Sequence, residues 1–300
     1  MTAGRLIMTK HPELVSPFLV MGQKGWLNAG EISTGCIDYL RLKLSARPLG
    51  YIESGGYYIN QIPTMNAGQT LRPYTQIKDG LVRKLDLPHN DFYYWKSGTD
   101  HDLILFLGAE PNLEWPAYAQ AVLDLARQFQ SPRIYFLGGI LDQVPHTRRS
   151  RIFATVSDPE IREELKTFSQ FSDYEGPCSF ATMFLVMARE QGMEFASLSA
   201  RTPLYIPDLN SQACHDLLKH VLALMGYHID MSDLRQSGET LTGLMDKAFS
   251  QNPKALDQLK KLEAQYDAAI GQDFLQVPGE DYENLMKEIR RLKKEGGKLH

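Results

Sequence analysis

The chain has 300 residues, of which 43% are hydrophobic and 23% are charged, the proportions of a soluble globular protein with a substantial core. Its 32 basic and 36 acidic residues give a formal net charge of -4, so the chain as a whole offers no broad attraction to nucleic acid or to an anionic membrane. The N-terminal apolar stretch is too short for a signal peptide, and no run of about 18 apolar residues predicts a membrane span. We therefore expect a cytoplasmic protein that binds neither nucleic acid nor membrane.

The cysteines and the absent motifs narrow the function further. Cys36, Cys178 and Cys214 are odd in number and far apart, which favours free thiols in a reducing compartment over a disulfide framework. The sequence contains no phosphate-binding P-loop, no GxGxxG, no GxSxG, no HExxH and no CxxC pair. We expect no cofactor and no metal site.

A strand, a helix and a second strand are predicted for the start of the chain. Phe18–Met21 is a short apolar strand, and Asn28 is a good N-cap for the helix that follows it. Apolar residues recur every four positions from Ile32 to Leu44, which predicts one buried helix face. The run Leu49–Ile52 then predicts a second strand, so we expect a βαβ unit with a parallel pair.

The pattern changes between Gly55 and Trp95, where short apolar and aromatic runs are separated by Gly, Pro and Asn. These runs predict hairpin strands inserted at a sheet edge. Parallel βα order resumes with Leu103–Leu107, a nearly unbroken apolar strand of the kind that is buried on both faces. A helix over Tyr118–Phe129 and a strand over Ile134–Leu137 follow.

The remaining elements of the α/β part follow from the same signals. Asp158 and Pro159 are typical of the N-cap and first position of a helix. In chain order we expect a strand at 152–156, helices at 159–168 and 179–191, a strand at 195–198 and a helix at 211–225.

From Asp230 onward only helical signals occur, the last of them between Tyr282 and Leu292. We therefore divide the chain into an α/β domain, residues 1–229, and a helical C-terminal extension, residues 230–300. The expected fold class is α/β: a three-layer αβα arrangement with a mostly parallel central sheet, an inserted hairpin region and an all-helical extension.

Candidate functional residues gather in loops that follow predicted strands, where open α/β sheets place their ligand sites. The first three of these loops contain glycines, aromatic residues and carboxylates near helix starts, which can hold a ligand or serve only as turns, caps and dipole partners. The candidate ligand or interface residues, without a catalytic assignment, are Gly25, Trp26, Asn28, Glu53, Glu110, Trp115, Gly138, Gly139, Asp142, His146, Thr147, Arg148 and Arg149.

The fourth loop, GGILDQVPHTRRSRIF at 138–153, concentrates the most reactive side chains. Its glycines allow an N–H concavity for an anion, His146 can move a proton near neutral pH, and its arginines can clamp a carboxylate or phosphate. The same groups suit a contact with another subunit or protein, or a loop that shapes the structure. All three interpretations remain open, because no nucleophile, base and orienting group can be assembled from the sequence.

Several separated motifs resemble, in order and spacing, the proteasome assembly chaperone 2 family. They are GWLNAGEISTG, LFLGAEPNLEW, FLGGILDQVPHTR and YEGPCSFATMFLVMAREQGMEFASLSARTPLYI, and the resemblance covers residues 15–230. It implies an α/β core like the phosphorylase/hydrolase-like fold of purine nucleoside phosphorylases, and a tendency to form homo-oligomers.

Family members that act on proteasomes carry a C-terminal tail of a hydrophobic residue, Tyr and any residue, whereas this chain ends Gly296–His300 without a penultimate tyrosine. We do not expect proteasome docking by such a tail. The first hypothesis is a non-catalytic, homo-oligomeric interaction or assembly protein with a possible protein partner. The alternative is an enzyme or sensor that binds an anionic or nucleoside-like small molecule at the loops on the carboxyl edge of the sheet.

Overall fold

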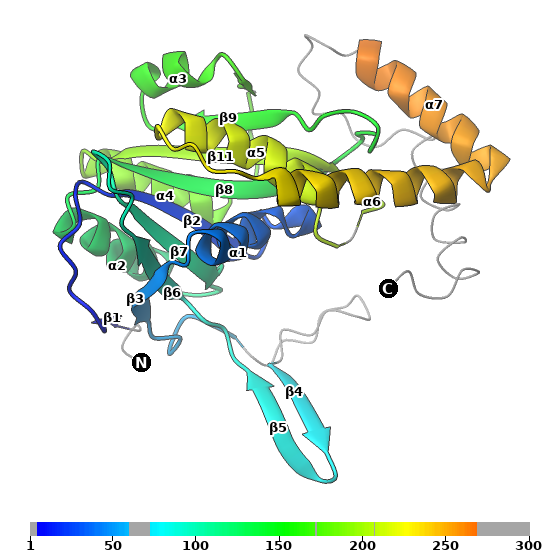
Figure 1. Cartoon of the computed structure of the whole chain (residues 1–300). Helices are drawn as coiled ribbons and strands as arrows, with labels where there is room; N and C mark the ends of the chain where they lie inside the picture. The colour runs from blue at the N-terminus through cyan, green and yellow to red at the C-terminus, as the bar shows by residue number, and fades with distance from the viewer. Residues whose placement is uncertain (1–4, 60–72, 172, 207, 269–300) are drawn as a thin grey trace.

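The computed structural model describes residues 5–59, 73–171, 173–206 and 208–268, and shows a sheet covered by helices on both faces (Figure 1). The strand order in this nine-stranded sheet is β1-β3-β6-β7-β2-β8-β11-β9-β10. Its strands are β1 (Leu6–Met8), β2 (Phe18–Lys24), β3 (Arg47–Ile52), β6 (Asp91–Trp95), β7 (Leu103–Ala109), β8 (Arg133–Asp142), β9 (Ile152–Val156), β10 (Ser169–Gln170) and β11 (Glu194–Pro203).

Four adjacent strands, β7, β2, β8 and β11, run parallel in the middle of the sheet. Their apolar runs explain this position, because strands covered on both faces bury almost every side chain. Antiparallel pairs extend the sheet on both sides, through β6 next to β7 and β9 next to β11. The predicted three-layer α/β fold with a mostly parallel sheet is confirmed.

Two separate hydrophobic clusters fill the two faces. On one face α1 (Ile32–Lys43), α3 (Pro159–Leu165) and α5 (Ser211–Leu224) contribute buried side chains to the first cluster. On the other, α2 (Trp115–Gln128) and α4 (Phe180–Glu190) contribute to the second. Helices that follow the adjacent strands β2 and β7 therefore cover opposite faces of the sheet. The loops after these strands diverge there, which is where open α/β sheets place ligands.

The first strand, helix and strand differ from the predicted unit in their pairing. β3 runs antiparallel to both of its neighbours, β1 and β6, and β6 and β7 separate it from β2. The expectation of a parallel pair was therefore wrong. The aromatic run of β6 supplies the reason, because it pairs with β7 along its whole length and occupies the place beside the parallel strands.

The inserted hairpin region is confirmed in part. β4 (Tyr74–Lys78) and β5 (Leu81–Asp86) form a separate two-stranded antiparallel sheet that projects from the body as an arm (Figure 1). Tyr57 lies in a turn and Tyr58 directly after it, so neither belongs to a strand.

Asn28 caps α1, but four residues before the helix begins and not directly before it. Residues Ala29–Glu31 form a short 3-10 turn, and Glu31 adopts a left-handed φ of 48°, so α1 begins at Ile32. The Asn28 Oδ1 atom accepts a hydrogen bond from the Thr34 backbone N–H at 3.0 Å, in the first turn of α1. The cap at Asp158 is as predicted, with its carboxylate accepting from Glu160 and Ile161.

The helical extension begins with α6 (Ser232–Ser250) and α7 (Pro253–Ala268). A third, smaller hydrophobic cluster joins these helices to the segment after β11, through Tyr205 and Ile206. The helical pattern between Tyr282 and Leu292, and the chain end at Gly296–His300, lie outside the described residues. Among those that are described, no helix is both long and apolar enough to cross a membrane.

Two glycines of α6 provide a matched test of how the extension docks on the α/β core. A Cβ atom at Gly238 would lie 2.8 Å from the Gln212 Cα atom of α5, whereas a Cβ atom at Gly243 would meet nothing within 4 Å. We expect Gly238→Ala to reduce the free energy of unfolding by about 1–3 kcal/mol, because the two backbones must separate. We expect Gly243→Ala to raise it by about 0.5–1 kcal/mol through helix propensity alone. Urea unfolding of both variants measures the difference, and equal effects of the same sign would contradict the close packing.

Candidate functional site at the carboxyl edge of the sheet

The candidate residues form two groups at the carboxyl edge of the sheet, with a junction between them. Glu110, Gly25, Trp26 and Trp115 gather where the loops after β2 and β7 meet the start of α4. Residues 146–149 gather beside α5, α6 and α7. Asp142 ends β8 next to them, with its carboxylate 3.7 Å from Nη1 of Arg201 on β11.

At the junction, Gly138 and Gly139 lie inside β8 and pair with β11, rather than forming an open loop. The Gly139 N–H donates to the Leu27 carbonyl at 2.8 Å, so it is not available to an anion. A Cβ atom at Gly139 would lie 2.2 Å from the Ala29 carbonyl oxygen. These glycines let the loop that contains Asn28 lie directly on the strand, and the expected N–H concavity is not formed.

Glu110 ties three elements together in the first group. One of its carboxylate oxygens accepts a hydrogen bond from the Trp26 N–H at 2.5 Å, and the other accepts from the N–H of Phe180, the first residue of α4, at 3.4 Å. Only glycine fits at position 25, because a Cβ atom there would lie 2.3 Å from the carboxylate. The acid therefore orders the loop and neutralises backbone donors at a helix start.

The two tryptophans have different environments. Trp115 donates from Nε1 to the Pro111 carbonyl at 2.7 Å and packs edge to face on Phe180. Trp26 is exposed. Glu53 lies apart from both groups, at the end of β3, where its carboxylate accepts from the Arg5 N–H.

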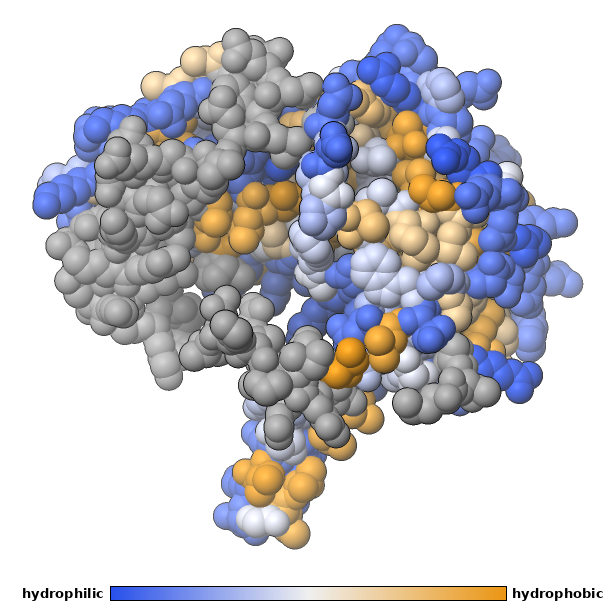
Figure 2. Space-filling model, turned by 180° about the vertical axis from the view of Figure 1, so that it is seen from behind, coloured by the Kyte–Doolittle hydropathy of each residue, from blue (hydrophilic) through white to orange (hydrophobic). Residues whose placement is uncertain are grey.

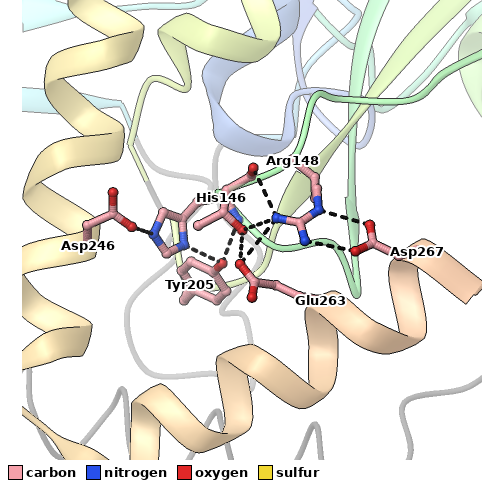
Figure 3. A network of polar contacts seen from close by, with 7 residues as sticks. His146, Arg148, Tyr205, Asp246, Glu263 and Asp267 are labelled. Carbon is pink, nitrogen blue, oxygen red and sulfur yellow. Dashed lines mark hydrogen bonds and ion pairs between the residues drawn. The ribbon is translucent and has the colours of Figure 1, made fainter.

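His146 is buried in the second group, between α6 and the segment that follows β11. Its Nε2 atom lies 3.1 Å from Asp246 of α6, and its Nδ1 atom lies 2.8 Å from the Tyr205 hydroxyl (Figure 3). Its ring also packs against Phe249 of α6. Burial lowers the pKa of His146 below its ordinary value. The neighbouring Asp246 acts in the opposite direction but does not cancel this shift. The side chain faces the C-terminal extension of its own chain.

Thr147 and Arg148 bind α7. The Arg148 guanidinium donates two parallel hydrogen bonds to Asp267, at 2.9 and 2.8 Å, and a third to Glu263 at 3.3 Å (Figure 3). Thr147 donates from its hydroxyl to the same Glu263 carboxylate. Paired N–H donors matched to one carboxylate are among the strongest ionic contacts that proteins make.

The next two arginines extend this contact. Arg149 donates to the buried carboxylate of Asp216 on α5 at 2.9 Å. Arg151 donates to the Tyr266 carbonyl of α7 at 2.8 Å and lies over the Tyr266 ring. We call residues 146–151, with their acidic and aromatic partners on α5, α6 and α7 and with Tyr205 after β11, the latch. Of the three interpretations of this loop, the described contacts favour the structural one.

Sequence reasoning missed the partners in the latch, namely Tyr205, Asp216, Asp246, Glu263, Tyr266 and Asp267. One signal for them was present. Glu263 and Asp267 are four residues apart on one helix, where two like charges destabilise the helix unless a cation faces them. The arginines at 148–151 are such cations, and they lie more than 110 positions earlier in the chain.

The comparisons with known proteins agree with this architecture. A model of the PAC2 family, the proteasome assembly chaperone 2 family, matches residues 24–248. No curated protein matches the sequence. The matched range ends inside α6, so α7 and its half of the latch lie beyond it.

Three solved structures illustrate the likeness in fold. A Mycobacterium tuberculosis protein of unknown function is 20% identical with a TM-score of 0.79, over 96% of this chain and 97% of that one. A M. tuberculosis proteasome-assembly chaperone homologue is 23% identical with a TM-score of 0.70, over 79% and 97%. A Pyrococcus furiosus archaeal proteasome activator is 20% identical with a TM-score of 0.63, over 82% and 99%.

Removing the arginine at the centre of the latch should loosen α7. We expect Arg148→Ala to lower the local opening free energy of α7 by about 1 kcal/mol, because it removes the paired contact to Asp267 in a partly exposed setting. Hydrogen exchange of the amides in Pro253–Ala268 should then be about fivefold faster. The matched control is Arg127→Ala, which removes an exposed arginine that pairs with Asp124 on α2. Unchanged exchange in α7 would contradict the latch.

The burial of His146 predicts a loss of stability in acid. Because its pKa is lowered in the folded state, the unfolded chain takes up a proton first as the pH falls below about 6.5, the ordinary histidine pKa. The free energy of unfolding should therefore decrease through this range, by at most about 1.4 kcal/mol per pH unit for this one group.

Urea unfolding between about pH 5 and pH 7.5 checks this, with the pH slope as the readout. His146→Gln should flatten the slope. His228→Gln, a change at an exposed histidine, should leave it unchanged. The pKa of His220 is also lowered by burial, so a residual slope is expected in the variant. Identical slopes for wild type and His146→Gln would refute the assignment.

Proposed function

The chain belongs to the PAC2 family, and from that premise we propose that it is a non-catalytic, homo-oligomeric assembly protein that binds other protein chains through exposed apolar surface. The observation that carries the proposal is the arm formed by β4 and β5. Relatives in fold that are described as a proteasome-assembly chaperone homologue and a proteasome activator support an assembly role.

One face of the arm is apolar and open to solvent. The register of the arm shifts by one residue between Gln76 and Ile77. Ile77 is therefore opposite Val82 while Thr75 is opposite Leu85, and these four side chains share a face. Ile77, Val82 and Leu85 are 61%, 65% and 57% exposed. Figure 2 shows apolar side chains on the part of the arm that extends away from the body.

Such an arm gains little stability on its own. A two-stranded hairpin without further packing is only marginally stable in water, even with a favourable turn such as Asp79-Gly80, where both residues have positive φ. Packing the apolar face against another chain would remove three large side chains from water. We infer that a second copy of this chain provides that surface, in keeping with the oligomers that the family resemblance implies.

The latch supports the non-catalytic part of the proposal. The histidine and arginines that looked most reactive in the sequence hold acidic partners on the chain's own helices. Placement in the cytoplasm is part of the same proposal, and the free thiols of Cys36, Cys178 and Cys214 are consistent with a reducing compartment.

Charge placed on the apolar face should dissociate the oligomer. We expect Val82→Lys to shift the molar mass in light scattering from that of an oligomer toward that of a 34.0 kDa monomer, because a buried lysine would lack a partner. Gln76→Lys is the matched control, since Gln76 pairs with Lys84 on the opposite face of the arm.

The control should keep the wild-type mass, and circular dichroism should show both variants to be folded. A wild-type chain that is monomeric at all concentrations would overturn the homo-oligomer, and an unchanged mass for Val82→Lys would exclude the arm as its contact.

A further inference from the structure

Three loops that join at the start of α4 carry exposed aromatic and apolar side chains. Trp26, Leu113 and Tyr174 are 65%, 43% and 62% exposed. Glu110 ties the loop of Trp26 to the start of α4, and the loop of Tyr174 leads directly into that helix. We call these three side chains, with the exposed acids Glu114, Asp173 and Glu175 of the same loops, the aromatic rim. Uncovered large side chains of this kind are typical of protein contact sites.

The aromatic rim is acidic. The loops at 108–115 and 173–178 contain four acidic residues and no Lys or Arg, and the loop at 24–31 adds one residue of each sign. Among the described residues, Asp173 and Glu175 form no ion pair. These unpaired acids, one on each side of an exposed tyrosine, favour an apolar partner surface that carries a cation.

The arm has the complementary character. Its register skips Arg83, so that Arg83 and Val82 together oppose Ile77. The arginine therefore adjoins the apolar face of the arm. Lys84 pairs with Asp86, whereas Arg83 pairs with no acid in the described part of the chain.

The arm cannot satisfy these groups on its own. It extends away from its own body, which leaves its apolar side chains and Arg83 exposed (Figure 1). Two arms packed face to face about a two-fold axis would bring two copies of Arg83 together, and like charges in a contact are unfavourable. An acidic aromatic surface, in contrast, removes the apolar face from water and pairs the arginine at the same time.

We propose that the arm of one chain docks on the aromatic rim of a second copy. The apolar face of the arm packs on Trp26 and Tyr174. Arg83 pairs with the acids on either side of Tyr174. This inference rests on the proposed function, because it names the surface that receives the arm. The contact is heterologous, so each chain contributes two different surfaces.

Complementation between two defective chains tests this contact. Val82→Lys damages the arm and leaves the rim intact, whereas the double change Asp173→Lys and Glu175→Lys damages the rim and leaves the arm intact. Each variant alone should show the mass of dissociated chains in light scattering. An equimolar mixture should form a complex, because one intact arm meets one intact rim. Packing of arm on arm cannot be rescued in this way, since every mixed pair contains a damaged arm.

Exchange of charges assigns the pairing within the contact. Arg83→Glu should raise the Kd of self-association about tenfold, because it places like charges together. Combining it with Asp173→Lys and Glu175→Lys should return the Kd to within about threefold of the wild-type value. Arg127→Glu reverses an arginine in the last turn of α2, away from the rim, and should leave the Kd unchanged.

The outcomes separate this contact from the proposed function. Circular dichroism should show every variant to be folded, because the changed side chains are exposed. Rescue in both experiments supports the contact. If Val82→Lys dissociates the oligomer but the rim variant keeps the wild-type mass, or if the mixture forms no complex, the contact is overturned and the proposed function stands. A wild type that is monomeric at all concentrations would overturn both.

Discussion

The close approach of the loop after β2 to strand β8 sets the geometry of the whole carboxyl edge. It depends on Gly139, where the backbone N–H donates to Leu27 at 2.8 Å and a side chain would collide with the Ala29 carbonyl. This contact fixes the start of α1 on the sheet. Gly30 in the same loop accepts at its carbonyl from the Asn210 N–H, which places the start of α5. Two backbone contacts of one loop thus position two helix starts on the same face, and the loop can lie this close to the sheet because Gly139 has no Cβ atom.

The latch then holds the C-terminal helices on this edge. Its buried contacts stabilise that position more than its exposed ion pairs do. Exposed ion pairs contribute little, because water and salt screen them and long side chains lose entropy. The contacts of His146 and Asp216 are different, because each of these side chains is largely removed from water. The contact of His146 with Asp246 specifies the docking position of α6, and the contact of Asp216 with Arg149 fixes the loop on α5. Each buried group would be unfavourable if its partner moved away.

The sequence predicted the layers well because hydrophobic periodicity is a local property. The apolar run of β7 and the four-residue spacing of α1 each lie within one element. Strand order and the role of the 138–153 loop are non-local. Nothing near residue 49 indicates that β6 separates β3 from the parallel strands, and Asp267, the partner of Arg148, lies 119 positions later in the chain. The predicted strand ended at Leu198, whereas β11 continues to Pro203, so the buried charge of Arg201 inside a strand was not expected. The domain division near residue 230 stays a prediction.

The latch reduces how much of the carboxyl edge of the sheet is open to ligands. Open α/β sheets normally present the loops at this edge to ligands, but here α6 and α7 cover the loop with the greatest concentration of reactive side chains. The family match ends at residue 248, so the latch contacts of Thr147, Arg148 and Arg151 with α7 involve residues beyond the matched region. The acids of the covering helices pair with His146 and Arg148, so these side chains hold the extension against the carboxyl edge and do not face solvent at an open ligand site.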